Sequence, residues 1–119
     1  MKKTILALAT LLATSTTAIA QDANFTLYNM TGYSIVEVYV SPSKQKNWGS
    51  DRLGNYTLEH GGWYKLSFPQ NRGQCVQDMK VVFADDKSDV TWEGFDLCTI
   101  DKIRLKYNRG TGVTSAETE

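Results

Sequence analysis

The sequence predicts an all-β protein: a small antiparallel β-sandwich of six to seven strands with an immunoglobulin- or prealbumin-like arrangement and one disulfide. Three observations predict this class. Short segments in which apolar and polar residues alternate follow one another through most of the chain. Turn-forming residues separate these segments about every 8–12 residues, and no stretch has the apolar spacing of an amphipathic helix. A small β-barrel is the alternative, because closing a sheet also removes its exposed edges.

The first expected strands lie in residues 24–68. Residues 24–32, NFTLYNMTG, alternate and end at a glycine. Residues 33–42, YSIVEVYVSP, end at Pro42, which cannot donate a hydrogen bond to a sheet. Residues 55–68 are expected to form two short strands around the turn His60-Gly61-Gly62. On the 33–42 strand, one face is expected to carry Val36, Val38 and Val40, and the other Ile35, Glu37 and Tyr39.

The second half of the chain predicts three more strands and a tail. Residues 75–98 are expected to form two strands joined at the acidic turn DDKSD, and residues 99–107 show the cleanest alternation. Residues 110–119 lack large apolar side chains apart from one valine, so we expect a disordered tail after a single domain spanning 21–109. The 99–107 strand is expected to carry Ile103, Leu105 and Tyr107 on one face and Lys102, Arg104 and Lys106 on the other.

Residues 1–20 have the pattern of a cleaved signal peptide. Lys2 and Lys3 form a basic start, the short apolar run ILALATLLA follows, and AIA supplies the small residues that a signal peptidase recognises. The apolar run is too short to span about 30 Å of hydrocarbon. We therefore expect cleavage after Ala20, no transmembrane segment after cleavage, and a periplasmic or secreted bacterial protein.

The charge of the chain is balanced. It has 13 basic and 13 acidic residues, and removal of residues 1–20 takes away two lysines and no acid. The remaining 99 residues therefore carry 11 basic and 13 acidic side chains, a net charge of −2. Nucleic-acid binding and polybasic membrane binding both depend on a cationic surplus, so neither is expected.

The two cysteines, Cys75 and Cys98, are expected to form a disulfide. An even number of cysteines in an exported chain is typical of such a bond. The expected strands on either side of DDKSD would bring both residues to the open end of one hairpin. A free thiol pair or a metal site is the alternative, but the spacing is not C-x-x-C and no histidine ligand accompanies it.

Candidates for catalysis are weak. His60 is the single histidine of the chain, and it lies in a glycine-rich turn without a nucleophile motif. The acidic residues of the second half could act in pairs or hold a cation, but DDKSD lacks the spacing of a calcium loop. Acids are also common at turns, where they accept hydrogen bonds. We therefore expect no enzyme activity, no cofactor and no bound metal.

The segment SPSKQKNWGSDRLG, residues 41–54, is the first candidate binding surface. It has the composition of a loop but contains Trp48 and Leu53. We favour the interpretation in which Trp48 folds back to cover the end of the core, with Leu53 beside it. The alternative is a displayed tryptophan flanked by the candidate binding residues Lys44, Lys46 and Arg52, which would stack on a sugar or anchor a protein partner.

The row Lys102, Arg104 and Lys106 is the second candidate surface. A solvated outer face is the simpler interpretation, because antiparallel sheets commonly have one wet side. The functional interpretation is a cationic patch for an acidic partner or an anionic polymer of the envelope.

Several sequence pieces resemble a known group of proteins. The pieces NMTG, VYVSPS, NWGSDRLG, CVQDMKVVFADD and WEGFDLC, which contain the patterns N-x-T-G, S-P-S, W-G-x-D-x-L-G and G-F-D-L-C, are similar to short exported proteins of bacteria, mostly proteobacteria. The resemblance spans about residues 25–107 and implies export and a fold, without implying an activity. The first half, with an Asn-x-Thr strand, an outward strand, and then a Leu-Gly and a Gly-Gly turn, is also similar to the β-domain of the von Hippel-Lindau family, which implies a prealbumin-like sandwich.

Together these features predict an exported, non-enzymatic binding or inhibitory module, of the immunity or inhibitor type. Its partner is expected to be a protein or an envelope polymer of the periplasm. The alternative is a structural or accessory protein of the cell envelope that acts through strand edges or weak self-association.

Overall fold

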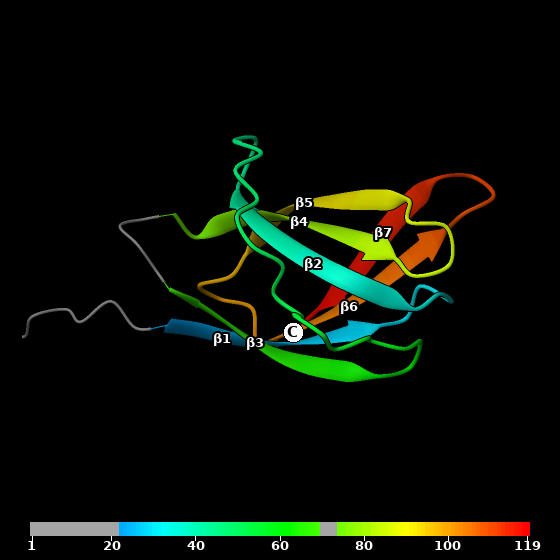
Figure 1. Ribbon diagram of the computed structural model, residues 1–119. Coiled ribbons are helices and arrows are strands. Elements are labelled where there is room, and N and C mark those ends of the chain that lie inside the picture. The colour runs from blue at the N-terminus through cyan, green and yellow to red at the C-terminus, as the bar shows by residue number, and fades with distance from the viewer. Residues whose placement is uncertain (1–21, 70–73) are drawn as a thin grey trace, which may run out of the picture.

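The computed structural model describes residues 22–69 and 74–119, and it is all-β (Figure 1). The expected signal peptide, residues 1–20, lies outside the described residues. No helix that could cross a membrane occurs in the described part of the chain. The strands are β1 (Asp22–Asn29), β2 (Ile35–Pro42), β3 (Trp63–Pro69), β4 (Val76–Phe83), β5 (Asp89–Asp96), β6 (Lys102–Asn108) and β7 (Val113–Thr118).

Two sheets face each other and form the predicted β-sandwich, which is not a closed barrel. One sheet has the strand order β3-β1-β6-β7 and the other has the order β2-β4-β5 (Figure 1). The predicted antiparallel pairing holds with one exception, because β1 and β6 run parallel. The parallel pair lies at the centre of the larger sheet, and the outer strands β3 and β7 pair antiparallel with β1 and β6.

The core lies between the sheets and follows the alternation of the strands. Phe25 and Leu27 of β1, and Ile103 and Leu105 of β6, point inward from the larger sheet and are at most 2% exposed. The smaller sheet contributes alternate residues of β2, β4 and β5 in the same way. The other buried apolar residues are Ile35, Val38, Val40, Leu53, Leu58, Leu66, Met79, Val81, Phe83, Trp92, Phe95 and Leu97.

The face assignment of β2 was wrong at its start. A bulge between Ile35 and Glu37 shifts the register against β4. Ile35 consequently lies in the core with no exposed surface, together with Val38 and Val40, although alternation had placed it on the opposite face from these valines. A bulge inserts one extra residue and so changes the side to which the preceding residues point.

The C-terminal prediction was also wrong, because residues 113–118 form β7 and pair with β6 along the whole strand. Ala116 packs against the core, and the indole nitrogen of Trp92 donates a hydrogen bond of 2.8 Å to the carbonyl oxygen of Ser115. An edge strand gains most of its stability from backbone pairing and needs few large side chains. Low apolar content was therefore a poor sign of disorder here.

The connection from β2 to β3 runs along the outer edge of β2. The Asp51 carboxylate accepts a hydrogen bond from the amide of Val38, and the amide of Arg52 donates to the Val38 carbonyl. Leu58 forms a single two-way backbone bridge with Ile35, so only this residue of the expected first strand of segment 55–68 pairs with a sheet. These contacts occupy backbone groups that an edge strand would otherwise expose.

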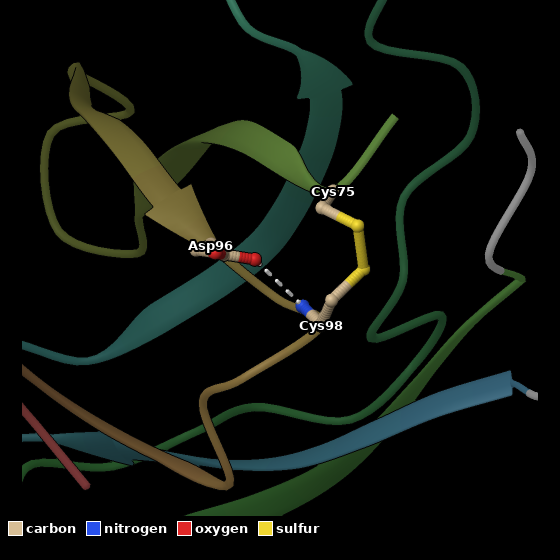
Figure 2. A group of neighbouring side chains, drawn as sticks. All are labelled: Cys75, Asp96 and Cys98. Atoms are coloured by element: carbon tan, nitrogen blue, oxygen red, sulfur yellow. Dashed lines mark hydrogen bonds between the residues drawn. A yellow bond between two sulfur atoms is a disulfide. The ribbon is translucent and has the colours of Figure 1, made fainter. Parts of the chain in front are cut away.

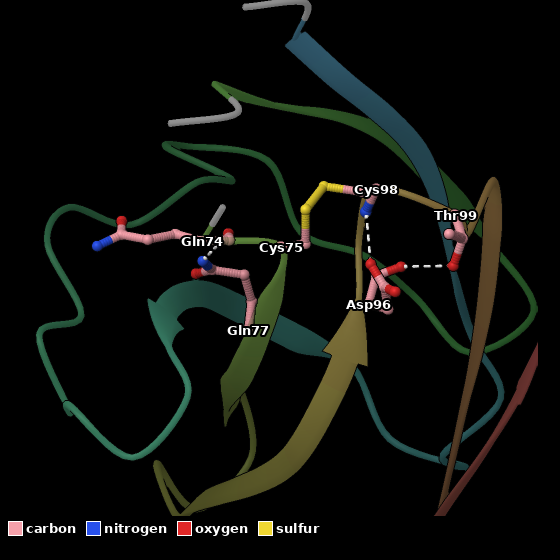
Figure 3. The surroundings of a disulfide bond; sticks show 6 residues. All are labelled: Gln74, Cys75, Gln77, Asp96, Cys98 and Thr99. Carbon is pink, nitrogen blue, oxygen red and sulfur yellow. Dashed lines mark hydrogen bonds between the residues drawn. A yellow bond between two sulfur atoms is a disulfide. The ribbon is translucent and has the colours of Figure 1, made fainter. Parts of the chain in front are cut away.

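The predicted disulfide joins Cys75 and Cys98, whose Cα atoms are 5.3 Å apart. Cys75 precedes β4 and Cys98 follows β5, so the bond closes the open end of this hairpin, as expected (Figure 3). The amide of Leu97 donates to the carbonyl of Cys75, and the Asp96 carboxylate accepts a hydrogen bond of 3.1 Å from the amide of Cys98. The chain is therefore covalently fixed where the two strands end.

Candidate functional site

The sequence-predicted site residues fall on two separate surfaces. Lys44, Lys46 and Trp48 belong to the loop of residues 43–50, which follows β2 and projects from the sandwich (Figure 1). The predicted cationic row lies on the outer face of β6 in the other sheet. The structure does not bring these two groups together into one site.

The projecting loop is built on a buried carboxylate. Asp78 of β4 is 4% exposed and accepts three hydrogen bonds: from the Ser43 hydroxyl at 2.7 Å, the Lys44 amide at 2.9 Å and the Gly94 amide at 2.9 Å. Burial alone raises the pKa of this carboxyl, but the hydrogen bonds from Lys44, Ser43 and Gly94 outweigh it and hold the pKa below its usual value. Asp78 thus ties the base of the loop to β4 and to β5.

The loop itself has a defined backbone. The amide of Gln45 donates to the carbonyl of Pro42, and the amide of Asn47 donates to the Ser41 hydroxyl at 2.8 Å. Lys44 and Lys46 adopt left-handed conformations with φ of 67° and 53°, which cost a side-chain-bearing residue about 1 kcal/mol or more. Residues 44–47 are exposed. The loop therefore presents two lysines on a fixed base.

Trp48 does not cover the core, and the favoured interpretation of this residue was wrong. Leu53, which is 3% exposed, fills the core position, whereas Trp48 is half-buried and lies outside the core cluster. The ammonium of Lys80 lies 5.1 Å from the Trp48 ring centre and 5.0 Å from the ring centre of Tyr39. Lys80 points away from the core, so Trp48 packs on the outer face of the β2-β4-β5 sheet at the foot of the loop.

The neighbouring Tyr39 is held by Glu37 of the same strand. Its hydroxyl donates a hydrogen bond to the Glu37 carboxylate, and this bond raises the pKa of Tyr39 to about 12.

Arg52, the last candidate of the loop, lies away from its tip. Its amide pairs with β2, and its guanidinium Nη1 donates to the carbonyl of Ser67 in β3 at 3.3 Å. Arg52 therefore bridges the edges of the two sheets and does not flank Trp48.

The outer face of β6 carries the predicted row, but β7 changes its charge. Arg104 pairs with Glu119 at 3.1 Å, and Lys106 pairs with Glu117 at 3.2 Å. By register, Glu117 stands opposite Arg104, and backbone bonds place Glu119 opposite Lys102. The side chain of each glutamate therefore pairs with the β6 cation two residues beyond the residue that it stands opposite. Two of the three predicted cations are neutralised, and Lys102 has no ion-pair partner among residues 24–67 and 74–119, whose side chains the structure describes.

The residues that lie beside Lys102 on this face were not predicted from the sequence. Thr26 of β1 stands between Lys65 of β3 and Lys102 of β6, and Tyr28 stands between Trp63 and Arg104. Trp63 is 56% exposed. The alternation in the segment WYKLSF indicates that its tryptophan and lysine lie on the same face of a strand. The strand order that places this strand near β6 could not be predicted from the sequence.

His60 and the acidic β4–β5 turn, the other residues considered for catalysis, make contacts within the fold. The His60 imidazole accepts a hydrogen bond of 2.9 Å from the amide of Gly32. Arg109 stacks on Tyr33, with 3.6 Å from guanidinium carbon to ring centre, and pairs with Asp85 through two hydrogen bonds of 2.8 and 3.1 Å. The Arg109 hydrogen bonds lower the pKa of Asp85 to about 2. This clamp joins the β6–β7 turn to the β4–β5 turn across the sandwich.

One group of potential metal ligands is present among the described residues. Potential ligand atoms of Cys75, Asp96 and Cys98 lie within 4.8 Å of one another (Figure 2). Both sulfurs are in the disulfide and neither is a thiolate, so the group offers a metal only a single carboxylate. The Asp96 carboxylate lies near the disulfide because it accepts a hydrogen bond from the Cys98 amide in the turn after β5, and this arrangement is a turn contact and not an ion site.

Comparison with known proteins gives no further assignment: no family model, curated protein or solved structure matches the chain. The resemblance to short exported bacterial proteins therefore stays a prediction.

Proposed function

We propose that the protein is an exported, non-enzymatic binding or inhibitory module that captures a partner protein through the loop of residues 43–50. The observation that carries this proposal is the anchoring of the loop on the buried Asp78 carboxylate. A loop whose backbone is already fixed loses little conformational entropy on binding, and this is how small rigid domains present contacts efficiently.

The charge of the loop indicates the kind of partner. Lys44 and Lys46 are exposed, and neither has an ion-pair partner within the described part of the chain. Their left-handed backbone conformations, with φ of 67° and 53°, are part of the fixed loop from which these two side chains project. An acidic surface or cleft on the partner fits these two ammonium groups.

Other features support export and a non-catalytic role. The disulfide is typical of proteins that mature in an oxidising compartment. His60 and Asp85, which would be natural catalytic candidates, are engaged in a turn and in the Arg109 clamp. The alternative function, assembly through strand edges, has less support because backbone groups of β2 are paired with residues 51–58 and β7 is linked to Trp92 of β5.

The test uses a photo-crosslinking residue at position 45, at the exposed tip of the loop, in protein exposed to periplasmic extract. We expect one saturable crosslinked partner, and we expect K44G/K46G to abolish its capture. Lys87→Gly is the matched control, because Lys87 also has a positive φ, of 60°, but lies in the β4–β5 turn. All three glycine substitutions suit the backbone, so thermal melts should be unchanged or slightly raised. Equal capture by the wild type and K44G/K46G, or no saturable partner at the loop, would refute the proposal.

A further inference from the structure

The outer face of the β3-β1-β6-β7 sheet combines unpaired cations with an exposed aromatic ring. Lys65, Thr26 and Lys102 form one row across three adjacent strands. The two lysines are two strand spacings apart, about 10 Å. Neither forms an ion pair with a side chain of residues 24–67 or 74–119. Glu117 of β7 pairs with Lys106, and Glu119, which follows β7, pairs with Arg104, so the positive charge of this face that has no ion pair lies in the Lys65–Lys102 row.

A shallow depression of about 460 Å³ lies over this row. Besides the two lysines it is lined by the polar residues Asn24, Thr26, Ser67 and Asp101, and by the apolar residues Phe25 and Leu66. The amide and the hydroxyls can donate and accept hydrogen bonds, as sugar hydroxyls require. The negative charge of Asp101 would repel an anionic ligand, so replacing Asp101 by a neutral residue should strengthen binding.

The next row of the same face is aromatic. Trp63 and Tyr28 are direct cross-strand neighbours, and the Arg104 guanidinium lies 5.2 Å from the centre of the Tyr28 ring. Arg104 is held in turn by Glu119. A tryptophan that is 56% exposed on a sheet surface offers more than half of its surface, including apolar ring atoms, to a ligand. Such rings stack on the apolar face of a sugar.

We infer that this face binds an anionic polysaccharide, a glycan chain that bears carboxylate or phosphate groups. The anionic groups would lie over Lys65 and Lys102, and one sugar ring would stack on Trp63. The open, shallow shape of the depression suits an extended polymer better than an enclosed small molecule. The inference does not rest on the proposed function, because the projecting loop belongs to a different surface.

Direct binding measurements on the purified protein test this inference, with isothermal titration and tryptophan fluorescence as readouts. The probes are oligogalacturonate as the carboxylated glycan, phosphomannan as the phosphorylated glycan, fully methyl-esterified oligogalacturonate as the neutral match, and poly-L-glutamate as an anion without sugar. We expect binding of one or both charged glycans, and the pair distinguishes a carboxylate from a phosphate preference. Binding should weaken as salt rises, because exposed charges are screened over about 8 Å at physiological ionic strength.

Variants connect the binding to individual residues. K65A/K102A should weaken glycan binding about tenfold, Trp63→Ala should weaken it about fivefold, and Asp101→Asn should strengthen it about twofold. K44G/K46G should leave it unchanged. All of these side chains are on the surface, and if the double variant unfolds, the single variants K65A and K102A provide the same comparison. Equal binding of poly-L-glutamate, equal binding of the neutral ester, or unchanged binding in the Trp63 and lysine variants would overturn the inference.

Discussion

Replacing Asp78 by asparagine should loosen the base of the projecting loop and destabilise the protein. Asparagine keeps the shape and one acceptor oxygen, so the bonds from Ser43 and Gly94 to the retained oxygen can persist. The second oxygen becomes an amide group that faces the Lys44 amide, and one charge-assisted hydrogen bond is lost. A hydrogen bond to a charged, buried group contributes about 1.5–3 kcal/mol. We therefore expect a loss of about 2–3 kcal/mol in the free energy of unfolding at neutral pH.

The pH dependence of the loss supplies a second check. Because the folded-state pKa of Asp78 lies below the usual value of 3.8, its stabilisation is present above that pH and is lost as the pH falls through the folded pKa. Urea melts of both proteins should therefore converge in acid. Asp89→Asn is the control, since Asp89 is exposed at the start of β5 and should change the free energy of unfolding by less than about 0.5 kcal/mol. A loss below about 0.5 kcal/mol for Asp78→Asn, or a loss that persists in strong acid, would refute the anchoring role.

Three further predictions concern stability. Leu53→Ala should cost about 2–5 kcal/mol in a urea melt, whereas Trp48→Ala should cost only about 1 kcal/mol, the size of a cation–π contact; equal losses would mean that Trp48 does fill the core. Cys98→Ser should lower the free energy of unfolding by about 2–5 kcal/mol, and mass spectrometry of the unreduced wild type should detect no alkylatable thiol. The pKa of Asp85, about 2, lies below its usual 3.8, so its contribution is present above about pH 4 and falls away toward pH 2. Arg109→Gln should remove this acid-dependent component, and melts of the variant that keep the wild-type acid dependence would contradict the clamp.

Much of the fold could be predicted because strand alternation reports which residues face a core. The inward positions of β1, β4 and β6 follow this rule, as Leu27, Val81 and Ile103 show. Alternation fails where the backbone departs from a regular strand, as at the β2 bulge beside Ile35. It also fails for β7, whose small side chains contribute little to the core and whose pairing depends on backbone hydrogen bonds with β6. These two errors concern long-range pairing, which local sequence does not encode.

The candidate sites depend even more than the strands do on long-range contacts that local sequence does not encode. Local sequence marked the loop of residues 43–50 by its composition, but it assigned the core position to Trp48, and only the structure shows that Leu53 occupies it. Asp78 looked like one acid among many, because nothing in its neighbourhood indicates that Ser43 lies beside it across 35 residues of chain. A site assembled from three strands, such as the Lys65–Lys102 row, needs the strand order before it can be recognised.

The distribution of charge over the molecule follows from that strand order and not from composition. The nearly balanced net charge of the chain did not predict a cationic surface. The alternation of Lys102, Arg104 and Lys106 predicted one, but it overestimated the positive charge of this face. β7 and the residue that follows it bring Glu117 and Glu119 to this face, where they pair with Lys106 and Arg104. The parallel pairing of β1 with β6 then places Thr26 beside Lys102, with Lys65 on its other side. The pairing of β7 thus decides which cations are neutralised, and the pairing of β1 decides which cation joins Lys102 next to the exposed Trp63. Because the loop with Lys44 and Lys46 lies outside this network, mutations at either surface can be interpreted separately, as the two proposed experiments require.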